Sequence, residues 1–389
     1  MSLTVATLAQ LRTSAGATLL AEATARAGDD LVRTTAALRA TGQDPELVAA
    51  ALTTVRLRQR AAVRLGEPAH RMFFTPDGAE QITRPAVAAH RATRYAGISP
   101  VADLCCGVGG DMLAFAAAGI AVEAIDADPL TAAIAAANAQ ALGLDDWVTV
   151  RCDDATAVEL ATFAGVFCDP ARRSGGRRTP DPESYAPPYS FVLDLLRKMS
   201  YAGAKLAPGL DHALIPTQVE AEWVSDRGVL VELALYSQGL ATATRRATVL
   251  PAGATLTGDG AQVAPVGEIG DWLYDPDSAV VRAHLVAELA ALLGARLMDP
   301  HIAYLTGPFV ETAFARAYPI EEVAPFSLKK LRSALRARDI GRLTILKRGS
   351  AVDVEQLRRD LRLTGSAEGS LALTRIGSRP IALICGPGQ

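Results

Sequence analysis

The stretch Val101-Ala-Asp-Leu-Cys-Cys-Gly-Val-Gly-Gly-Asp111 decides the fold of this chain. An apolar run that ends in Asp103 leads into a turn with Gly107, Gly109 and Gly110, and the alanine-rich residues 112–118 then predict a helix. Glycines at such a turn let the backbone approach a ligand closely, and ligands of open α/β sheets bind beyond the carboxyl ends of the strands. The stretch therefore predicts a nucleotide-binding corner made of a strand, a tight turn and a helix.

The spacing of the glycines distinguishes between classes of nucleotide. A dinucleotide-binding turn follows the pattern G-x-G-x-x-G, but here Met112 stands where the third glycine belongs. Asp111 at the start of the helix would also repel a pyrophosphate. Asp103 before the turn suits S-adenosylmethionine, because the methionine end of that cofactor carries an ammonium group. We therefore favour S-adenosylmethionine over a nicotinamide or flavin dinucleotide, and over a fold without a ligand.

Two further strands are predicted to end in carboxylates. The run 121–125 ends in Asp126, where a carboxylate can accept both hydroxyls of a ribose. The run 148–151 ends in Cys152-Asp153-Asp154, where a carboxylate can accept from the amino group of adenine. Together with the glycine turn, these strand ends predict the following cofactor residues: Asp103, Cys105, Gly107, Gly109, Asp126, Asp153 and Asp154.

Composition excludes several classes of protein. Half of the 389 residues are apolar and the net charge is −3, so a large core is expected and an overall polycation is excluded. The five cysteines include no C-x-x-C pattern and the five histidines are scattered, so we expect neither a disulfide framework nor a metal site. The sequence shows neither a signal-peptide pattern nor an apolar run of membrane-spanning length, and we expect a cytoplasmic protein.

The chain is predicted to divide into four parts: an N-terminal helical region (1–96), a Rossmann-like α/β domain (97–250), a connecting segment (251–308) and a small basic α+β domain (309–389). In the second part, seven strands are expected at 100–105, 121–125, 147–151, 164–168, 203–207, 228–236 and 242–249, with helices at 110–118, 129–142, 155–161 and 189–199. The last two strands are joined by only a few residues, 237–240. We therefore expect them to form an antiparallel hairpin at the far edge of the sheet, as is usual in methyltransferases.

The C-terminal part is strongly basic. Residues 326–389 contain thirteen Lys and Arg residues against five Asp and Glu residues, so this part carries +8 while the rest of the chain carries −11. Such an asymmetry is typical of a nucleic-acid-binding surface, although solvated helix faces would have a similar composition. We also predict a helix at 278–293, helices at 327–338 and 353–361, and strands at 341–347, 369–376 and 380–385. The candidate RNA contacts are Lys329, Lys330, Lys347 and Arg348.

The fourth strand, 164–168, ends in Asp169-Pro170-Ala171-Arg172, which we take as the reaction centre. Asp169 should lie near the transferable methyl group, either as a base or as the group that holds an acceptor N–H. Pro170 makes the turn rigid because its ring fixes φ. Arginines at 172, 173, 177 and 178 could hold phosphates in a loop beside the cleft or simply be solvated. The predicted catalytic residues are Asp169, Pro170 and Arg172, and the predicted substrate-binding residues of the loop are Arg172, Arg173, Arg177 and Arg178.

With these residues in place, the chain resembles class I S-adenosylmethionine-dependent methyltransferases, and more narrowly the bacterial family that carries a C-terminal THUMP-like domain. Its core is similar to that of the trimethylguanosine synthases. The similarity rests on Asp103-Leu-Cys-Cys-Gly-Val-Gly-Gly110, on Ala124-Ile-Asp-Ala-Asp-Pro129 followed by Asn138, and on Phe74-Thr75 with Thr83-Arg-Pro-Ala-Val-Ala-Ala-His90. The last two segments resemble the part of the family that precedes the fold and covers the cofactor.

The resemblance implies particular roles. It implies that Gly107 and Gly109 line the cofactor, that Asp126 holds its ribose and Asp154 its adenine, and that the substrate is RNA. One departure matters: enzymes that methylate amino groups have a second proline and then an aromatic after Asp-Pro, where this chain has Ala171 and Arg172. A guanidinium can stack on a base instead.

We therefore expect an enzyme that methylates a base nitrogen in tRNA or rRNA. The alternatives are a methyltransferase that acts on a small molecule and a protein that binds the cofactor and RNA without catalysis.

Overall fold

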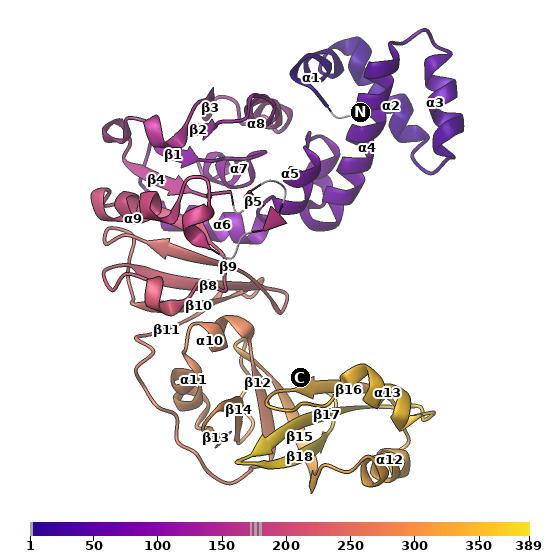
Figure 1. The fold of residues 1–389 in the computed structure, drawn as a ribbon, viewed down its shortest axis with the longest axis vertical. Helices are drawn as coiled ribbons and strands as arrows, with labels where there is room; N and C mark the ends of the chain where they lie inside the picture. Colours follow the sequence, from indigo (N-terminus) through magenta and orange to yellow (C-terminus); the bar gives the residue numbers. More distant parts are fainter. Residues whose placement is uncertain (1–2, 172, 175–176, 179–180) are drawn as a thin grey trace. The chain divides into compact units, whose positions relative to one another are not determined.

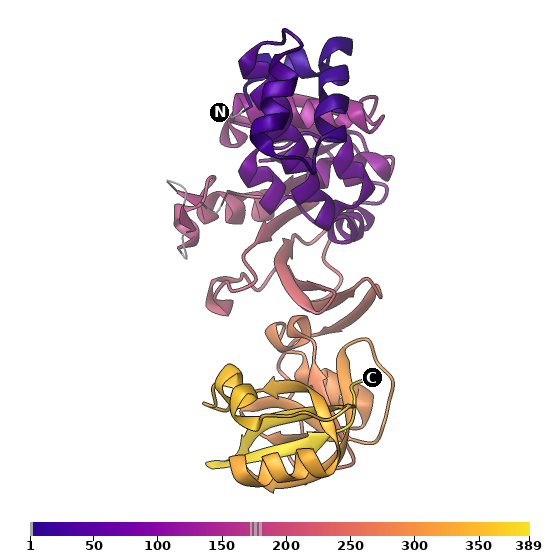
Figure 2. The ribbon, with the colours of Figure 1, turned by 90° about the vertical axis from the view of Figure 1, so that its right-hand side faces the viewer.

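The computed structural model describes residues 3–171, 173–174, 177–178 and 181–389. The chain forms two compact units (Figures 1 and 2). The first unit consists of Met1–Val219 and Ala234–Thr242, and the second consists of Glu220–Leu233 and Ala243–Gln389. The chain therefore passes from one unit to the other three times.

The first unit begins with helices, as predicted. These helices are α1 (Val5–Leu11), α2 (Ser14–Ala25), α3 (Leu31–Arg39) and α4 (Pro45–Leu65) (Figure 1). Each of them begins after a side chain that accepts a hydrogen bond from the backbone of the first helical turn, namely Thr4, Thr13, Asp30 and Asp44. Such caps satisfy N–H groups that have no partner within the helix, so each start is specified locally by one residue.

Five parallel strands follow in the first unit, and all five are confirmed predictions. They are β1 (Val101–Leu104), β2 (Val122–Asp126), β3 (Val148–Cys152), β4 (Gly165–Cys168) and β7 (Ala202–Leu206), adjacent in the order β3-β2-β1-β4-β7. The connecting helices are α7 (Gly110–Ala117), α8 (Pro129–Ala141) and α9 (Tyr189–Lys198). The predicted helix at 155–161 is instead two short 3-10 turns, Ala155–Ala157 and Leu160–Thr162.

The predicted hairpin between 228–236 and 242–249 is wrong. An additional strand, β8 (Glu220–Asp226), lies between β9 (Val229–Tyr236) and β10 (Arg245–Leu250), and β10 pairs with β8 in parallel. The hairpin partner of β9 is β8, because the two-residue turn Arg227-Gly228 joins them, with φ values of 52° and 76°. The nine-stranded sheet thus has the order β11-β10-β8-β9-β7-β4-β1-β2-β3, where β11 is Ala254–Gly258.

Strand β8 was not predicted, because its buried side chains are largely polar. Glu220, Glu222 and Ser225 are completely buried, so the sequence shows no apolar run to mark a strand. These carboxylates are compensated by partners on β10 that lie far along the chain. The Arg246 guanidinium lies 2.7 Å from Glu220, and the Thr248 hydroxyl donates to Glu222. Because buried carboxylates are tolerated only when they are paired, this strand depends on a neighbour that local patterning does not reveal.

The remainder of the second unit contains a seven-stranded sheet with the order β13-β14-β12-β15-β18-β17-β16. Its strands are β12 (Trp272–Pro276), β13 (Arg296–Asp299), β14 (Ile302–Gly307), β15 (Ala315–Pro325), β16 (Ile340–Lys347), β17 (Ala367–Ile376) and β18 (Arg379–Cys385). Strands β16, β17 and β18 and the helices α12 (Leu328–Ala337) and α13 (Val354–Leu361) are confirmed predictions. Both helices pack on this sheet through an apolar cluster that includes Leu331, Leu335 and Leu357.

The predicted helix at 278–293 is divided into α10 (Ser278–Arg282) and α11 (Val286–Leu293). His284, between them, has a φ of 61°, a left-handed conformation that cannot continue a helix. Within the described ranges, no helix combines the length and the hydropathy that a membrane crossing requires.

Candidate functional site

The turn after β1 has the tight geometry that its glycines predict. Cys105, Gly107 and Gly109 have positive φ values of 61°, 57° and 97°. The backbone N–H of Gly107 donates to Asp126 Oδ2 over 3.0 Å, which ties this turn to the end of β2. Gly110 must lack a side chain, because a Cβ there would lie 2.8 Å from Ile82 and 3.0 Å from the backbone of Thr83. The turn is thus held between β2 and a segment that precedes the sheet.

Asp126 is half-buried at the end of β2 and each of its oxygens accepts one backbone hydrogen bond. Oδ2 accepts from Gly107, and Oδ1 accepts from the N–H of Asp128 over 3.0 Å. Burial raises the pKa of this carboxyl above its ordinary value, and the two hydrogen bonds act in the opposite direction. A carboxylate oxygen has lone pairs beyond the one used, so Asp126 retains the capacity to accept from ligand hydroxyls.

A cavity of about 340 Å³ lies at the carboxyl ends of the strands. This volume lies in the range that is typical of small-molecule sites. Five of the predicted site residues line it, namely Cys105, Gly107, Asp126, Asp169 and Pro170. The segment that precedes the sheet contributes another part of the wall, with Thr75, Asp77, Gly78, Gln81, Ile82 and Thr83. The structure therefore brings the ends of β1, β2 and β4 together with residues 75–83.

Lys205, on β7, is a site residue that the sequence analysis missed. Its Nζ lies 2.5 Å from Asp169 Oδ2 and 3.1 Å from the hydroxyl of Thr83, and the side chain is only 12% exposed. Lys205 therefore joins Asp169 to the segment that covers the cavity. The sequence did contain a signal, since a lone lysine among the small and apolar residues of a strand needs a partner when it is buried.

Asp111 lies at the start of α7, and its charge is paired. Its carboxylate accepts from the Thr83 hydroxyl over 2.6 Å and forms an ion pair with Arg91, whose side chain is only 1% exposed. The Arg91 guanidinium also lies over the Phe167 ring, 4.4 Å from its centroid. This buried network fixes Thr83 in the wall of the cavity. It also explains why α6 (Pro85–Arg94), which carries Arg91, packs against α7.

Four other predicted cofactor residues lie apart from the cavity lining. Asp103 is completely buried beneath it, and desolvation, followed by repulsion from Asp111 and Asp169, raises the pKa of its carboxyl well above the ordinary value. Asp153 accepts from the N–H of Asp154 over 2.8 Å. Asp154 is exposed and accepts from the N–H and hydroxyl of Thr156, which lowers its pKa. Neither aspartate is part of the lining, and Gly109 is a buried residue of the turn.

The predicted substrate-binding arginines lie mostly at the edge of what the structure describes. Arg172 lies outside the described residues. Arg173 belongs to β5 (Arg173–Ser174), while Arg177 and Arg178 form β6, and the two strands pair as a short antiparallel ribbon.

The predicted RNA contacts of the second unit differ from one another in their surroundings. Lys329 and Lys330 are exposed on α12. Lys347 donates to the carbonyl of Val352 over 3.2 Å. Arg348 is held in place, because its Nε lies 2.8 Å from Asp275 Oδ1 and its Nη2 donates to the carbonyl of Pro276. The structure thus leaves two of the four free of such contacts.

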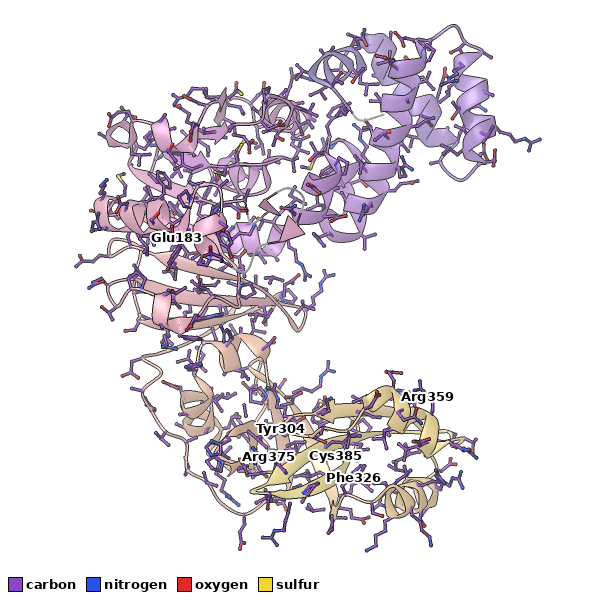
Figure 3. The ribbon with its side chains drawn as sticks, in the orientation of Figure 1. Glu183, Tyr304, Phe326, Arg359, Arg375 and Cys385 are labelled. Carbon is purple, nitrogen blue, oxygen red and sulfur yellow. The ribbon has the colours of Figure 1, made fainter. Side chains whose placement is uncertain are left out.

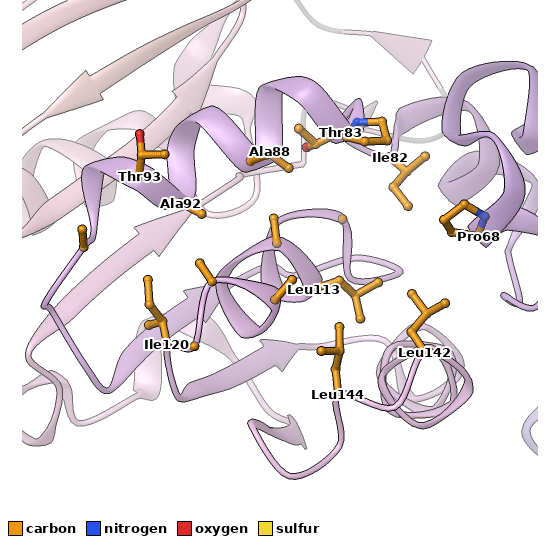
Figure 4. A pocket seen from close by; sticks show the side chains of 18 of the residues that line it. Pro68, Ile82, Thr83, Ala88, Ala92, Thr93, Leu113, Ile120, Leu142 and Leu144 are labelled. Carbon is orange, nitrogen blue, oxygen red and sulfur yellow. The ribbon is translucent and has the colours of Figure 1, made fainter. Parts of the chain in front are cut away.

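A second, larger cavity of about 800 Å³ lies between α6 and α7 and has a mostly apolar lining (Figure 4). Ala88, Ala92, Leu113 and Ile120 are among its lining residues. Ile82, Thr83 and Gly110 line this cavity and the smaller one alike, so they form a shared wall. The smaller cavity is the better candidate for an active site because the polar and charged side chains converge there.

The fold and the site together define a class I methyltransferase. The order β3-β2-β1-β4-β7-β9-β8 is the seven-stranded arrangement of that class, extended here by β10 and β11. Family profiles match three parts of the chain: RNA cap guanine-N2 methyltransferase over residues 98–172, THUMP domain-like over 315–387, and a domain of unknown function over 4–61.

Similar proteins define the family to which the chain belongs within this class. An uncharacterized S-adenosylmethionine-dependent methyltransferase of Mycobacterium tuberculosis, found in strains H37Rv and CDC 1551, is 37% identical over 350 residues, which cover 86% of this chain and 96% of the relative. The chain belongs to this family of S-adenosylmethionine-dependent methyltransferases. The crystal structure of a protein named as a methyltransferase, from Porphyromonas gingivalis W83, has the same fold, with a TM-score of 0.73, 23% identity, and coverage of 88% of this chain and 91% of that one.

The cofactor is S-adenosylmethionine, and the cavity fits it. Asp126 offers acceptors for ribose hydroxyls, and the positive φ values of the turn expose backbone beside it. Within the described part of the chain, no group of three or more His, Cys, Asp or Glu side chains could hold a metal ion.

Proposed function

We propose that this protein methylates a nitrogen atom of an RNA base, with Asp169 holding the acceptor. The observation that carries the proposal is the pair formed by Asp169 and Lys205 in the wall of the cofactor cavity. A carboxylate at this position accepts the N–H of an amino or imino group and directs the nitrogen lone pair. The proposal includes the assignment of Gly107 and Asp126 to the cofactor.

Most of the chemistry would come from the bound cofactor, whose sulfonium methyl group a nitrogen lone pair can attack, with S-adenosylhomocysteine as the leaving group. The protein positions the reacting groups. Pro170 is buried and makes the backbone after Asp169 rigid, and the Lys205 ammonium stabilises the charge of the Asp169 carboxylate. Once the nitrogen has gained a methyl group it must lose a proton, and we assign the uptake of that proton to the Asp169 carboxylate in the cavity wall.

The choice of RNA rests on the second unit and on two family matches. Residues 315–387 match a THUMP-like domain, and residues 98–172 match a family that acts on guanine N2 of an RNA cap. Residues 326–389 carry the net charge of +8 on which electrostatic binding of a polyanion depends.

A polar cavity in the second unit offers a place for RNA phosphates. It has a volume of about 610 Å³ and contains Arg316 from β15, Arg342 from β16 and Arg358 from α13. Arg342 pairs with the exposed Glu368 over 2.8 Å, and Arg358 donates to the carbonyl of Leu343. Guanidinium groups offer more donors than these contacts use, so they can also bind phosphate oxygens. We infer that this cavity, in addition to the lysines of α12, contacts RNA.

The test is methyl transfer from tritium-labelled S-adenosylmethionine to total RNA of a strain that lacks the protein, followed by mass spectrometry of nucleosides. We expect label in RNA, in a base that is methylated on nitrogen. The variant Asp169→Asn should reduce the rate by about a hundredfold or more, because it cannot take up the proton. Asp194→Asn, an exposed residue of α9, is the matched control and should retain the rate. Label in a small-molecule fraction, with unlabelled RNA, would contradict the proposed substrate.

A further inference from the structure

Two cysteines meet at the carboxyl ends of neighbouring strands. In the pairing of β1 with β4, Leu104 is opposite Cys168, so Cys105 follows directly after the partner of Cys168. Cys105 has the left-handed backbone conformation at the start of the turn, and its thiol interacts with the buried thiol of Cys168. The two cysteines therefore lie at the ends of adjacent strands, which is the arrangement that a disulfide between them requires.

The two thiols differ in their surroundings. Cys105 is half-buried and lines the cofactor cavity, and its Sγ lies 3.9 Å from the carbonyl of Ala186. Cys168 is completely buried, and its hydrogen bond with Cys105, followed by desolvation, raises the pKa of its thiol well above the ordinary value. A small oxidant that enters the cavity therefore reaches Cys105 first and Cys168 only through Cys105.

The remaining cysteines lie in different settings. Cys106 is buried with its Sγ near the carbonyl of Gly107, and Cys152 is exposed at the end of β3, near the carbonyl of Ala127. Cys385, labelled in Figure 3, ends β18 of the second unit and is buried there. Cys152 is thus a suitable control, since it is accessible but is not hydrogen-bonded to a second cysteine in the contacts recorded for it.

We propose that Cys105 and Cys168 form a reversible disulfide under peroxide, and that this disulfide prevents the binding of S-adenosylmethionine. In the first step the Cys105 thiolate attacks one oxygen of hydrogen peroxide, the O–O bond breaks, and a sulfenic acid and hydroxide form. The hydroxide takes up the proton that the thiol has lost and becomes water. In the second step Cys168 sulfur displaces the sulfenic hydroxyl, which leaves as water with the Cys168 proton. Two thiols are oxidised and one peroxide is reduced to two waters.

The position of the bond explains its effect. Cys105 lies two residues before Gly107, whose N–H holds Asp126, and Cys168 directly precedes Asp169. A covalent bond of about 2.05 Å between the two sulfur atoms draws the turn towards the end of β4. The turn then leaves the position in which its backbone faces the cofactor. A dithiol restores both thiols by exchange, because the more exposed sulfur, that of Cys105, lines the cavity.

Peptide mapping without reduction tests the bond itself. After treatment of the full chain with hydrogen peroxide, we expect a cross-linked peptide that contains Cys105 and Cys168. Preloading with S-adenosylhomocysteine should slow its formation, because the ligand occupies the space beside Cys105. A bond between Cys105 and Cys106, or oxidised monomeric peptides alone, would overturn the proposal.

Calorimetric titration with S-adenosylmethionine tests the consequence. The affinity of the oxidised protein should fall at least about tenfold and return after treatment with dithiothreitol. In Cys168→Ala the affinity before oxidation should stay near the wild-type value and no cross-link should form, whereas Cys152→Ala should behave as the wild type in every respect. An unchanged affinity in fully cross-linked protein would refute the effect on binding. Peptide mapping detects the cross-link whether or not the cofactor binds in this cavity. A missing cross-link therefore counts against the thiol pair alone, and it is distinguishable from a failure of the proposed cofactor assignment.

Discussion

The side chain of Asn138 on α8 bonds both backbone groups of Phe73, which lies 65 residues earlier in the chain. Its Oδ1 accepts the N–H of Phe73 over 2.7 Å, and its Nδ2 donates to the carbonyl of Phe73 over 3.0 Å. The same Nδ2 also donates to the carbonyl of Val108 over 2.8 Å. One buried amide therefore holds both the segment that covers the cavity and the turn that forms its floor.

Replacing this amide should loosen both elements together. Asn138→Ala leaves buried backbone groups without partners, at a cost of about 1–3 kcal/mol in the free energy of unfolding for each unsatisfied group. Binding of S-adenosylmethionine should weaken as well, because the covering segment is released. Urea denaturation and calorimetric titration measure the two effects. Ala136→Ser, at an exposed position of the same helix, should leave the affinity unchanged and cost at most about 0.5 kcal/mol in stability.

Asp126 should govern affinity for the cofactor. We expect Asp126→Ala to weaken S-adenosylmethionine binding about tenfold to a hundredfold, because hydrogen bonds to a charged group contribute about 1.5–3 kcal/mol. Asp128→Ala is the control: it removes the cap of α8, where Asp128 accepts from the N–H of Thr131, but no group of the cavity lining. The control should lower the thermal midpoint while the dissociation constant stays within about twofold. Equal affinity in wild type and Asp126→Ala would refute the assignment.

Lys205 should affect turnover more than cofactor affinity. In Lys205→Met the Asp169 carboxylate loses its counter-charge in a half-buried position, so Asp169 should hold the acceptor less well. We expect kcat for methyl transfer to fall at least about tenfold. Lys205→Arg keeps the charge and should retain more of the activity than Lys205→Met. Equal losses in both variants would show that the length of the lysine, rather than its charge, is what matters.

The pair of Arg91 and Asp111 should dominate the stability of the first unit. Removing one partner of a buried ion pair leaves the other charge uncompensated, so Arg91→Met should lower the free energy of unfolding by about 3–5 kcal/mol. The double variant Arg91→Met/Asp111→Asn should recover part of the loss, since the neutral amide can still accept from Thr83. Denaturation of the four proteins in a double-mutant cycle gives the coupling, and strict additivity would contradict a direct pair.

Asp103 makes stability depend on pH. Its carboxyl has a raised pKa in the folded chain, so the folded state keeps a proton that the unfolded state releases above about pH 4. The unfolded state then binds fewer protons, and the contribution of Asp103 to stability falls as the pH rises from the unfolded pKa towards the folded one. Asp103→Asn should therefore gain stability relative to the wild type as the pH rises above about 4. Urea denaturation across that range gives the difference, and a constant offset would contradict the titration.

The strand ends that line the candidate site were predictable, whereas the contacts between distant segments were not. Asp126 and Asp169 each close an apolar run, and a parallel sheet places such ends at one edge, so their approach followed from local pattern alone. Asp153 and Asp154 fit the same pattern, but their carboxylates accept from the local backbone and do not line the cavity.

Lys205, Thr83 and the buried carboxylates of β8 required knowledge of the partners opposite them. Lys205 meets Thr83 across 122 residues, and Glu220 meets Arg246 across 26. The spacing of residues along the sequence does not indicate which distant residues form such pairs. The missed strand and the missed lysine have this common cause, since in each case a charge is buried next to an opposite charge that lies elsewhere in the chain.

The interleaving of the two units has a consequence for the gene. Residues 220–233 belong to the second unit and 234–242 to the first, so the chain returns to the first unit after it has begun the second. A single stop codon or a single start site therefore cannot release either unit whole: ending the chain before residue 220 removes the last part of the first unit, and starting it after residue 242 removes the first part of the second. A simple end-to-end fusion of two genes would not produce this arrangement, and any exchange of the second unit between relatives must carry residues 220–233, which include strand β8, as well as residues 243–389.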